Sequence, residues 1–570
     1  MRGFGRFSLP AFAILVAACT PRGGVSTVPS AGGAYDVVIE NGRVIDGTGA
    51  AWFYGDVAVR GDRIAGIGPR GAFSAARAAQ RVDATGLVVA PGFIDIQAQS
   101  YGNFMGGDGR ALSMVTQGIT TAILGEGDTP APVNDKILAL ERDSAARARM
   151  QRFSGPHGFG DWLEFMIARG ASQNIGSFVG NGTVRVYGHG GGMGAATPAE
   201  IDTMQAMVRR AMQDGAFGIA SALIYPPNAY ASTAELIEVN KAAAPYGGVY
   251  ITHMRNEGDK LLEAMDEALA IGKGAGVPVE IYHLKAAGVR NWPKMDRAMA
   301  KIDSARAAGQ DVQADMYLYP AGANGFSACI PPKYSADGKL IENLKNAALR
   351  ATIVQEIHAR DAGYDNLCEA AGPENVMVVG FRTPALLQYE GKRLSEIAAA
   401  EKKDWAEVII DFNVAENAGL DEILFLMSED NLKNQIRQPW MKFGTDASAQ
   451  DPATARGMTH PRAYGNFTRL LGKYVRNERV TPLEDAVRKA SSAVATRLSI
   501  TDRGVLKPGL KADVIVFDPN TVIDNATFER PHQLSTGVRD VFVNGVAVVR
   551  DGQHTGAKPG QVVRGPGYLR

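Results

Sequence analysis

Two short apolar runs that each end on a histidine constrain the fold of this chain more than any other feature. The stretch over residues 248–285 reads GVYITHMRNEGDKLLEAMDEALAIGKGAGVPVEIYHLK, with a helical segment between the two runs. A β-branched run, a helix of about ten to fifteen residues and a second β-branched run form a βαβ unit with parallel strands. Parallel strands end at the same edge of a sheet, so His253 and His283 are expected to lie side by side.

These two imidazoles predict a metal site at the carboxyl edge of the sheet. Neutral imidazole is the commonest zinc ligand, and two of them on neighbouring strand ends can reach one ion. The alternative is that each side chain only makes a hydrogen bond to a loop, which is the commoner role of a single strand-end histidine. The matched positions of His253 and His283 on successive strands favour the metal site.

The middle of the chain carries eight strand-like segments, which begin near residues 92, 119, 175, 216, 249, 279, 311 and 441. Most are followed by segments with apolar residues at three- and four-residue spacing, which is typical of helices. Eight strands that alternate with helices predict an α/β fold with a (β/α)8 TIM-like barrel. The seventh and eighth strands are separated by residues 325–439, which have helical segments of their own and are predicted to form an inserted cap.

Both ends of the chain have β-type sequence, with alternating apolar residues and Asn-Gly or Gly-Asp turns. Residues 35–90 and 480–570 are therefore predicted to form one small β-sandwich domain. The metal-dependent barrel of residues 91–479, which includes the cap, is inserted between its two halves. Residues 19–34 are rich in Gly, Pro and Ser and are expected to be a flexible tether.

The first 18 residues have two arginines followed by the apolar run LPAFAILVAA, which is typical of a secretory signal and too short to span a bilayer. The sequence VAAC at its end resembles the bacterial lipoprotein box, in which the cysteine is lipidated. An ordinary signal peptide cleaved nearby is the alternative. The lipoprotein reading places a lipid on Cys19 and the protein in the bacterial cell envelope, facing the periplasm. Because Thr20 follows the cysteine instead of Asp, the outer membrane is expected.

Charge and cysteine content exclude several classes of protein. Lys+Arg and Asp+Glu both number 60, so there is no basic excess for binding nucleic acid. Membrane contact is expected only through a lipid on Cys19. Three cysteines are too few for a disulfide framework or a Cys-rich zinc module, and the pairing of Cys329 with Cys368 is left open, as is the oligomeric state.

The eighth strand-like segment, MKFGTDAS, ends on a carboxylate that suits acid–base chemistry. Asp446 would face a metal held by His253 and His283, where it could take a proton from water as a general base. The alternative is a helix cap, since Asp-x-Ser is common before helices. The presence of the two histidines favours catalysis.

Several motifs resemble known proteins. YDVVIENGRVIDGTG, VAPGFIDI and GLKADVIVFDP resemble the amidohydrolase superfamily, and SALIYPPNAYASTAELIEV, GVYITHMRNEGD, YHLK, QADMYLYP, FGTDAS and HPRAYGNFTRLLGKYV are similar to D-aminoacylases, the N-acyl-D-amino-acid deacylases. The resemblance extends from about Tyr35 to Gly560. It implies a zinc-dependent hydrolase that cleaves the linear amide C–N bond of N-acyl amino acids, expected to be of D configuration, or of small peptides.

The resemblance also implies roles for individual residues. His253 and His283 match the two histidines that hold the zinc needed for activity, and Asp446 matches the base of the eighth strand. The family has a bridging cysteine after the second strand, where this chain reads Gly-Glu-Gly-Asp. Glu126 is the expected replacement, because a carboxylate is an acceptable zinc ligand, and Asp128 is a second choice.

The carboxylate of the substrate is held in this family by a lysine, a tyrosine and an arginine, which match Lys285, Tyr225 and Arg462. Two cations that converge on one carboxylate are physically sensible, and Arg offers a two-pronged donor. A family hydroxyl after the seventh strand has no counterpart near Gly322 and Ala323, so that contact is expected to be lost.

The sequence departs from the resemblance at the first strand, where amidohydrolases have His-x-His. Gln97 and Gln99 occupy those positions, and neutral amides bind zinc weakly through oxygen alone. Asn181 stands where D-aminoacylases tend to have a histidine. A site with one zinc ion, held by Glu126, His253 and His283, is therefore expected.

Two alternatives to the linear amidohydrolase fit parts of the sequence. A degenerate barrel could serve as an envelope-anchored binding protein without catalysis, although Asp446 and both histidines are present. A cyclic-amide hydrolase of the same superfamily would usually bridge two metals with a carboxylated lysine on the fourth strand. The segment AFGIASALIY contains no lysine.

Overall fold

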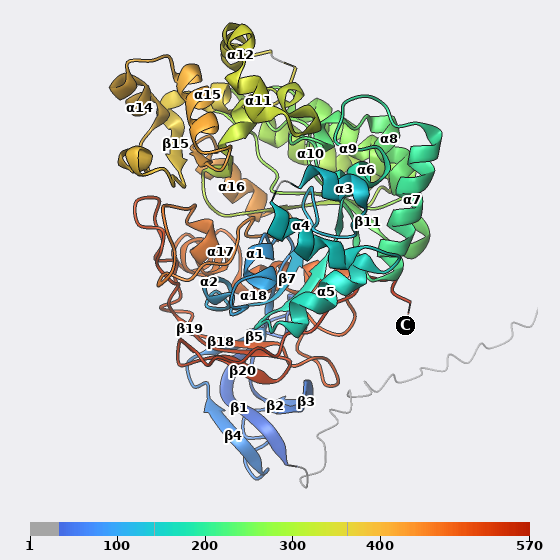
Figure 1. The fold of residues 1–570 in the computed structure, drawn as a ribbon. Coiled ribbons are helices and arrows are strands. Elements are labelled where there is room, and N and C mark those ends of the chain that lie inside the picture. The colour runs from blue at the N-terminus through green and yellow to red at the C-terminus, as the bar shows by residue number, and fades with distance from the viewer. Residues whose placement is uncertain (1–33, 142, 362, 570) are drawn as a thin grey trace, which may run out of the picture.

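The computed structural model describes residues 34–569, except residues 142 and 362 (Figure 1). The expected signal segment and Cys19 lie outside the described residues, so both stay predictions. Within the described part of the chain, no helix combines the length and the hydropathy that crossing a bilayer requires.

The centre of the molecule is built from parallel strands at the positions that the sequence indicated. One sheet contains β6 (Phe93–Asp95), β7 (Ile119–Leu124) and β8 (Asn174–Ser177). A second sheet contains β9 (Val179–Gly180), β10 (Gly218–Ala222), β11 (Val249–His253), β12 (Val279–Ile281), β13 (Val312–Met316) and β17 (Met441–Phe443). Nearly every residue of these strands is buried, as expected where helices cover a parallel sheet.

The two sheets approach each other at both ends. Phe178 alone separates β8 from β9, and the backbone N–H of Phe217 donates to the carbonyl of Ser177 at 3.1 Å. At the other end, Ala98 forms a parallel bridge with Ala447. The carboxyl ends of the strands therefore face one opening. The helices packed outside them include α7 (Pro198–Gln213), α8 (Thr233–Asn240), α9 (Leu261–Ala275) and α10 (Met295–Ala307) (Figure 1).

The two ends of the chain meet in one nine-stranded sheet. It contains β1 (Tyr35–Val44), β2 (Phe53–Arg60), β3 (Arg63–Pro69), β4 (Ala78–Asp83), β5 (Val88–Pro91), β18 (Val514–Phe517), β19 (Val538–Val543), β20 (Val546–Arg550) and β21 (Gln553–His554). β5 pairs antiparallel with β18, and a shared core draws apolar side chains from both ends of the chain. The strands from both ends are thus hydrogen-bonded into one sheet.

The expected domain start at residue 480 differs from the structure. Residues after it form α18 (Leu483–Ala490) and α19 (Ser492–Arg497), which contact the central strands β17 and β6. The strands of the nine-stranded sheet resume only at Val514. From the sequence alone, two short amphipathic helices can be read either as the end of the central domain or as the start of the terminal one. The sequence pattern alone therefore misplaced the boundary.

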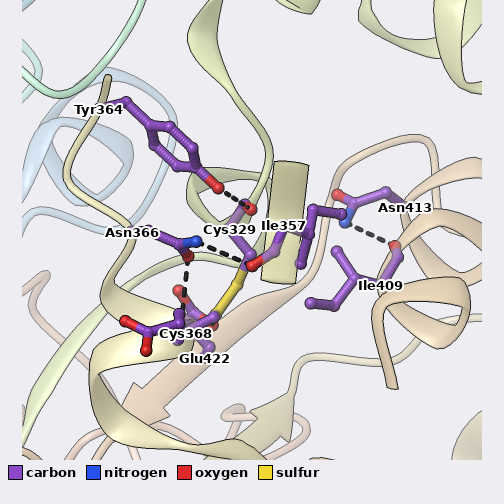
Figure 2. Close-up of a disulfide and its surroundings, with 9 residues drawn as sticks. Cys329, Ile357, Tyr364, Asn366, Cys368, Ile409, Asn413 and Glu422 are labelled. Carbon is purple, nitrogen blue, oxygen red and sulfur yellow. Dashed lines mark hydrogen bonds between the residues drawn. A yellow bond between two sulfur atoms is a disulfide. The ribbon is translucent and has the colours of Figure 1, made fainter. Parts of the chain in front are cut away.

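The residues that were expected to form a cap contain strands as well as helices. Their antiparallel sheet has the order β14 (Gly322–Gly325), β16 (Asp421–Leu424) and β15 (Val376–Val379). The helices around it are α11 (Leu340–Lys345), α12 (Ala347–His358), α13 (Leu367–Ala371), α14 (Leu394–Glu401) and α15 (Trp405–Ala415). Cys329 and Cys368, whose pairing the sequence left open, form a disulfide within the cap (Figure 2).

Candidate functional site

Three side chains meet where the central strands end. Glu126 follows β7, His253 is the last residue of β11, and His283 follows β12. The Oε1 atom of Glu126 lies 3.2 Å from Nε2 of His283 and 3.4 Å from Nδ1 of His253. One ligand atom from each residue lies within 4.8 Å of the others, so the trio has the spacing of a metal site. The structure therefore brings together the three residues expected to bind zinc.

The second oxygen of Glu126 is held by the two glutamines of the first strand end. The side-chain Nε2 atoms of Gln97 and Gln99 each donate to Oε2 of Glu126 at 2.6 Å. Both amides thus point their nitrogen toward the carboxylate, and the buried Oε1 of Gln97 has no hydrogen-bond partner. Two N–H donors occupy the side of Glu126 that faces away from the histidines.

A further acid lies behind the imidazoles. Glu257 places Oε1 3.0 Å from Nδ1 of His283 and Oε2 3.6 Å from Nε2 of His253. Each imidazole therefore has one nitrogen near Glu126 and the other near Glu257. The sequence reasoning missed Glu257, although its position four residues after His253, where the chain passes the strand end, was a usable signal.

Lys285 contacts both Glu257 and His283. Its Nζ atom lies 2.6 and 2.7 Å from the two oxygens of Glu257 and 2.8 Å from Nδ1 of His283. Lys285 is buried, and its ammonium group also lies 5.7 Å from the ring centre of Tyr317. The lysine expected to hold a substrate carboxylate is therefore paired with a carboxylate of the protein.

The charges at this point favour a cation. Burial opposes ionisation of Glu126, but hydrogen bonds and the charges of His253 and His283 outweigh it and hold its pKa well below the usual value. Burial likewise opposes the charge of Glu257, and Lys285 with the imidazoles lowers its pKa. Burial and Lys285 disfavour protonated His283, yet the two glutamates raise its pKa to about 10. Two ionised carboxylates around two imidazoles stabilise positive charge between them.

Asp446 lies on the loop after β17, in the left-handed backbone region with a φ of 48°. Its backbone N–H donates to the carbonyl of Gln97 at 2.8 Å, so it lies beside the first strand end. Its Oδ2 atom is 2.9 Å from Nη1 of Arg462, whose guanidinium stacks 4.4 Å from the ring centre of Tyr317. Burial raises the pKa of Asp446, while Arg462 acts in the opposite direction. Asp446 therefore combines a buried position with a raised pKa, as acid–base groups of active sites often do.

These residues line a cavity of about 410 Å³ between the strand ends and the cap. Tyr225 lines it with its ring 5.5 Å from that of His253. His460 also lines it, but its two nitrogens contact the carbonyl of Ala321 and the backbone N–H of Arg462. His460 therefore holds two backbone segments together through its ring nitrogens.

Asp128, the second choice for the metal ligand, has a different environment. Its carboxyl lines the cavity and burial raises its pKa to about 6, but no ion pair joins it to an imidazole among the described residues. Asn181 donates to the side chain of Asn228 at 3.2 Å, away from the Glu126 trio. Glu126 is thus the acid placed to share a cation with the two histidines.

Comparison with known proteins shows which family the chain resembles. A model of the amidohydrolase family matches residues 431–549. The chain is 33% identical over 530 residues to a D-aminoacylase of Alcaligenes xylosoxydans xylosoxydans, which covers 93% of this chain and 97% of that protein.

Two solved structures superpose over the same span. One is a D-aminoacylase with a binuclear metal centre, in which one metal activates the enzyme and a second metal attenuates it. It has a TM-score of 0.76 and 33% identity, and the match covers 93% of this chain and 100% of that chain. The other is the N-acyl-D-glutamate deacylase of Bordetella bronchiseptica in complex with zinc and a phosphonate inhibitor, with a TM-score of 0.75, 31% identity and the same coverage. The chain is a hydrolase of amide bonds and belongs to the D-aminoacylase family of amidohydrolases.

Proposed function

We propose that this protein is a zinc-dependent N-acyl-D-amino-acid deacylase with one zinc ion per chain. The observation that carries the proposal is the convergence of Glu126, His253 and His283 at the end of the central strands. Imidazole and carboxylate are ligands that zinc accepts, and the surrounding charges favour a cation there. Bound zinc would polarise the amide carbonyl and lower the pKa of a water molecule.

The restriction to one ion rests on Gln97 and Gln99. Both donate N–H groups to Oε2 of Glu126, so that oxygen is shielded from a second cation. A glutamine could offer its amide oxygen only by turning over and giving up this hydrogen bond. The D-aminoacylase with the binuclear centre is described as activated by one metal, which supports a working site with a single ion.

Asp446 is the proposed general base and acid. It lies beside the first strand end, where its backbone N–H donates to the carbonyl of Gln97 at 2.8 Å, and its carboxylate would take a proton from the attacking water. The same carboxyl group would then give the proton to the amine that leaves. Arg462, at 2.9 Å, holds the carboxylate in place before the substrate enters.

The carboxylate of the substrate is assigned to Arg462, Lys285 and Tyr225. The buried Nε atom of Arg462 has no hydrogen-bond partner and is free to donate. Lys285, which is hydrogen-bonded to Glu257, would contribute its ammonium group, and Tyr225 lines the same cavity. A buried guanidinium with an open donor suits a carboxylate, because it can bind in a two-pronged manner.

The finer architecture is also proposed. The bridge between Ala98 and Ala447 supports one closed (β/α)8 barrel made from both parallel sheets. The order of sequence segments supports export by residues 1–18, lipidation at Cys19 and a tether over residues 19–34, which would anchor the enzyme in the cell envelope.

A panel of N-acetyl-D- and N-acetyl-L-amino acids, given to zinc-loaded protein, tests the activity. We expect turnover of D substrates only, with about one zinc per chain by elemental analysis. Turnover of L substrates or of cyclic amides alone would contradict the substrate class. A folded protein that binds no zinc and turns nothing over would instead be the envelope-anchored binding protein.

A further inference from the structure

A second group of soft and acidic ligand atoms lies in the cap, apart from the Glu126 trio. Cys329 ends a short helix (Phe326–Cys329), Cys368 lies in α13, and Glu422 lies in β16. The two Sγ atoms form the disulfide, and Oε2 of Glu422 lies 3.0 Å from each of them (Figure 2). We call these three residues the cap cysteine cluster.

Glu422 is poorly satisfied when the cysteines are oxidised. Its side chain is fully buried, and Oε1 has no hydrogen-bond partner. No lysine, arginine or histidine pairs with it in the part of the chain that the structure describes, and the charged residue that acts on it is another acid, Asp421. A disulfide has no proton to donate, so Oε2 gains nothing from the two sulfurs. A buried carboxyl group without a cationic partner stays protonated unless it binds a metal, and burial raises the pKa of Glu422 well above its usual value.

We propose that the reduced cap cysteine cluster is a second metal site, which takes a divalent cation such as zinc through two thiolates and one carboxylate. The three ligand atoms already lie within 4.8 Å of one another, and all three residues are buried. In a tetrahedral site, two sulfurs at about 2.3 Å from zinc lie about 3.8 Å apart. The Cα atoms are 5.5 Å apart, so side-chain rotation can separate the sulfurs without moving the backbone. Thiolates select soft cations of this kind over magnesium or calcium.

The conversion needs a reductant, and a dithiol supplies it. The dithiol breaks the Cys329–Cys368 bond, gives two electrons and two protons to the sulfurs, and leaves as its own cyclic disulfide. Zinc then displaces both thiol protons, and the Glu422 carboxylate completes three ligands. Leu367 and Glu422 line the main cavity, from which water can occupy the fourth position.

The site would join three segments of the cap: the short helix, and α13 and β16, which both line the cavity. A disulfide joins only the first two of them, whereas the metal would also hold β16, the central strand of the cap sheet. The cap cysteine cluster takes no part in the proposed deacylation, so a test of its metal binding is independent of that proposal.

Cobalt(II) gives a readout that the Glu126 trio cannot produce. Thiolate ligands add near-ultraviolet charge-transfer absorption to bound cobalt, whereas carboxylate and imidazole ligands do not. The experiment uses the full chain with Cys19→Ser in every sample, so that Cys329 and Cys368 are the remaining cysteines. One sample is reduced with a dithiol and one is left oxidised; both are desalted without oxygen and titrated with cobalt. Thiol titration before metal addition measures how far reduction has gone.

The expected result is charge-transfer absorption and one additional cobalt per chain in the reduced sample alone. A Cys329→Ser/Cys368→Ser variant should lose both signals and keep the cobalt bound elsewhere, and Glu422→Gln should weaken cobalt binding in the reduced sample. Glu369→Gln, on the same helix as Cys368, is the matched control and should change neither. Two titratable thiols without the absorption would overturn the inference, as would a disulfide that resists reduction in the folded protein. An unchanged cobalt affinity in Glu422→Gln would overturn the role of the carboxylate.

Discussion

The carboxylate of Glu257 lies 3.0 Å from Nδ1 of His283 and 2.6 Å from Nζ of Lys285. One acid therefore contacts a proposed metal ligand and a proposed substrate-binding cation. Outer carboxylates of this kind fix the ring orientation of a ligand histidine and strengthen its basic nitrogen. Glu257 thereby couples the metal side of the cavity to the substrate side.

Replacing this acid should weaken both sides together. In Glu257→Gln we expect zinc affinity to fall by about 10- to 100-fold, the usual cost of losing such an outer partner. The KM for N-acyl-D-amino acids should rise as well, because Lys285 loses the carboxylate that positions it. Competition with a chelator measures the affinity, and Glu263→Gln, at an exposed position on α9, is the control. A normal zinc affinity with a raised KM would show that Glu257 positions Lys285 but does not support the metal ligands.

Restoring imidazoles at the first strand end should change the number of ions. Gln97→His/Gln99→His replaces two amide donors with two good zinc ligands beside Oε2 of Glu126. We expect about two zinc ions per chain in this variant against about one in the wild type, measured by elemental analysis after dialysis. The isosteric control Gln97→Glu tests whether a negative charge at one position suffices without imidazole. One ion in the double histidine variant would show that the surrounding residues, and not the glutamines, exclude the second metal.

Removing the proposed base should abolish turnover without removing the metal. In Asp446→Asn we expect kcat to fall by at least about 10²-fold, the typical contribution of a positioned general base. Zinc content should stay at the wild-type value, because Asp446 is not among the three clustered ligands. Asp430→Asn, at an exposed position on α16 (Glu429–Ile436), should keep wild-type kinetics. Retained turnover in Asp446→Asn would assign the proton transfer to another group.

The pH dependence should report the pairing of Asp446 with Arg462. The base works as a carboxylate, so kcat/KM is lost as the pH falls through the pKa of Asp446. Burial raises that pKa and the guanidinium of Arg462 lowers it, so Arg462→Gln should raise it further. The acid limb of the kcat/KM profile should therefore move to higher pH, along with a raised KM. Arg456→Gln, at an exposed position in the same loop, should leave the profile unchanged. A shift to lower pH would contradict the assigned ion pair.

The sequence predicted the parts of this molecule that follow from local pattern. Strands of β-branched residues and the helices between them have a clear period, and the order of strands places Glu126, His253 and His283 at one edge. Glu257 was missed because it lies on a loop, where no periodicity indicates which way a side chain points. The strands of the cap were missed because four residues are too few to show alternation.

The boundary at residue 480 failed for a related reason. Arg497 in α19 is buried against β12, where its Nε atom lies 2.8 Å from Oε2 of Glu280, and Lys442 of β17 lies 2.9 Å from the other oxygen. Charged residues on a short helix are typical of a solvent-exposed face, so the sequence gives no sign of this buried contact. The ion pair links a segment assigned to the terminal domain with the central strands.

Breaking that buried ion pair should cost more than breaking a surface pair. In Arg497→Met, Glu280 keeps only Lys442, whose own pKa burial lowers to about 8 despite the nearby glutamate. We expect a loss of about 3 kcal/mol in the free energy of unfolding, because an under-compensated buried charge is left behind. Arg488→Met removes the pairing with Asp485, where both side chains are about 30% exposed, and should cost less than about 1 kcal/mol. Urea unfolding followed by tryptophan fluorescence compares the two variants. Equal losses of unfolding free energy in the two variants would show that Glu280 is solvated or neutral in the folded protein. The contact between α19 and β12 would then stabilise the protein through packing alone.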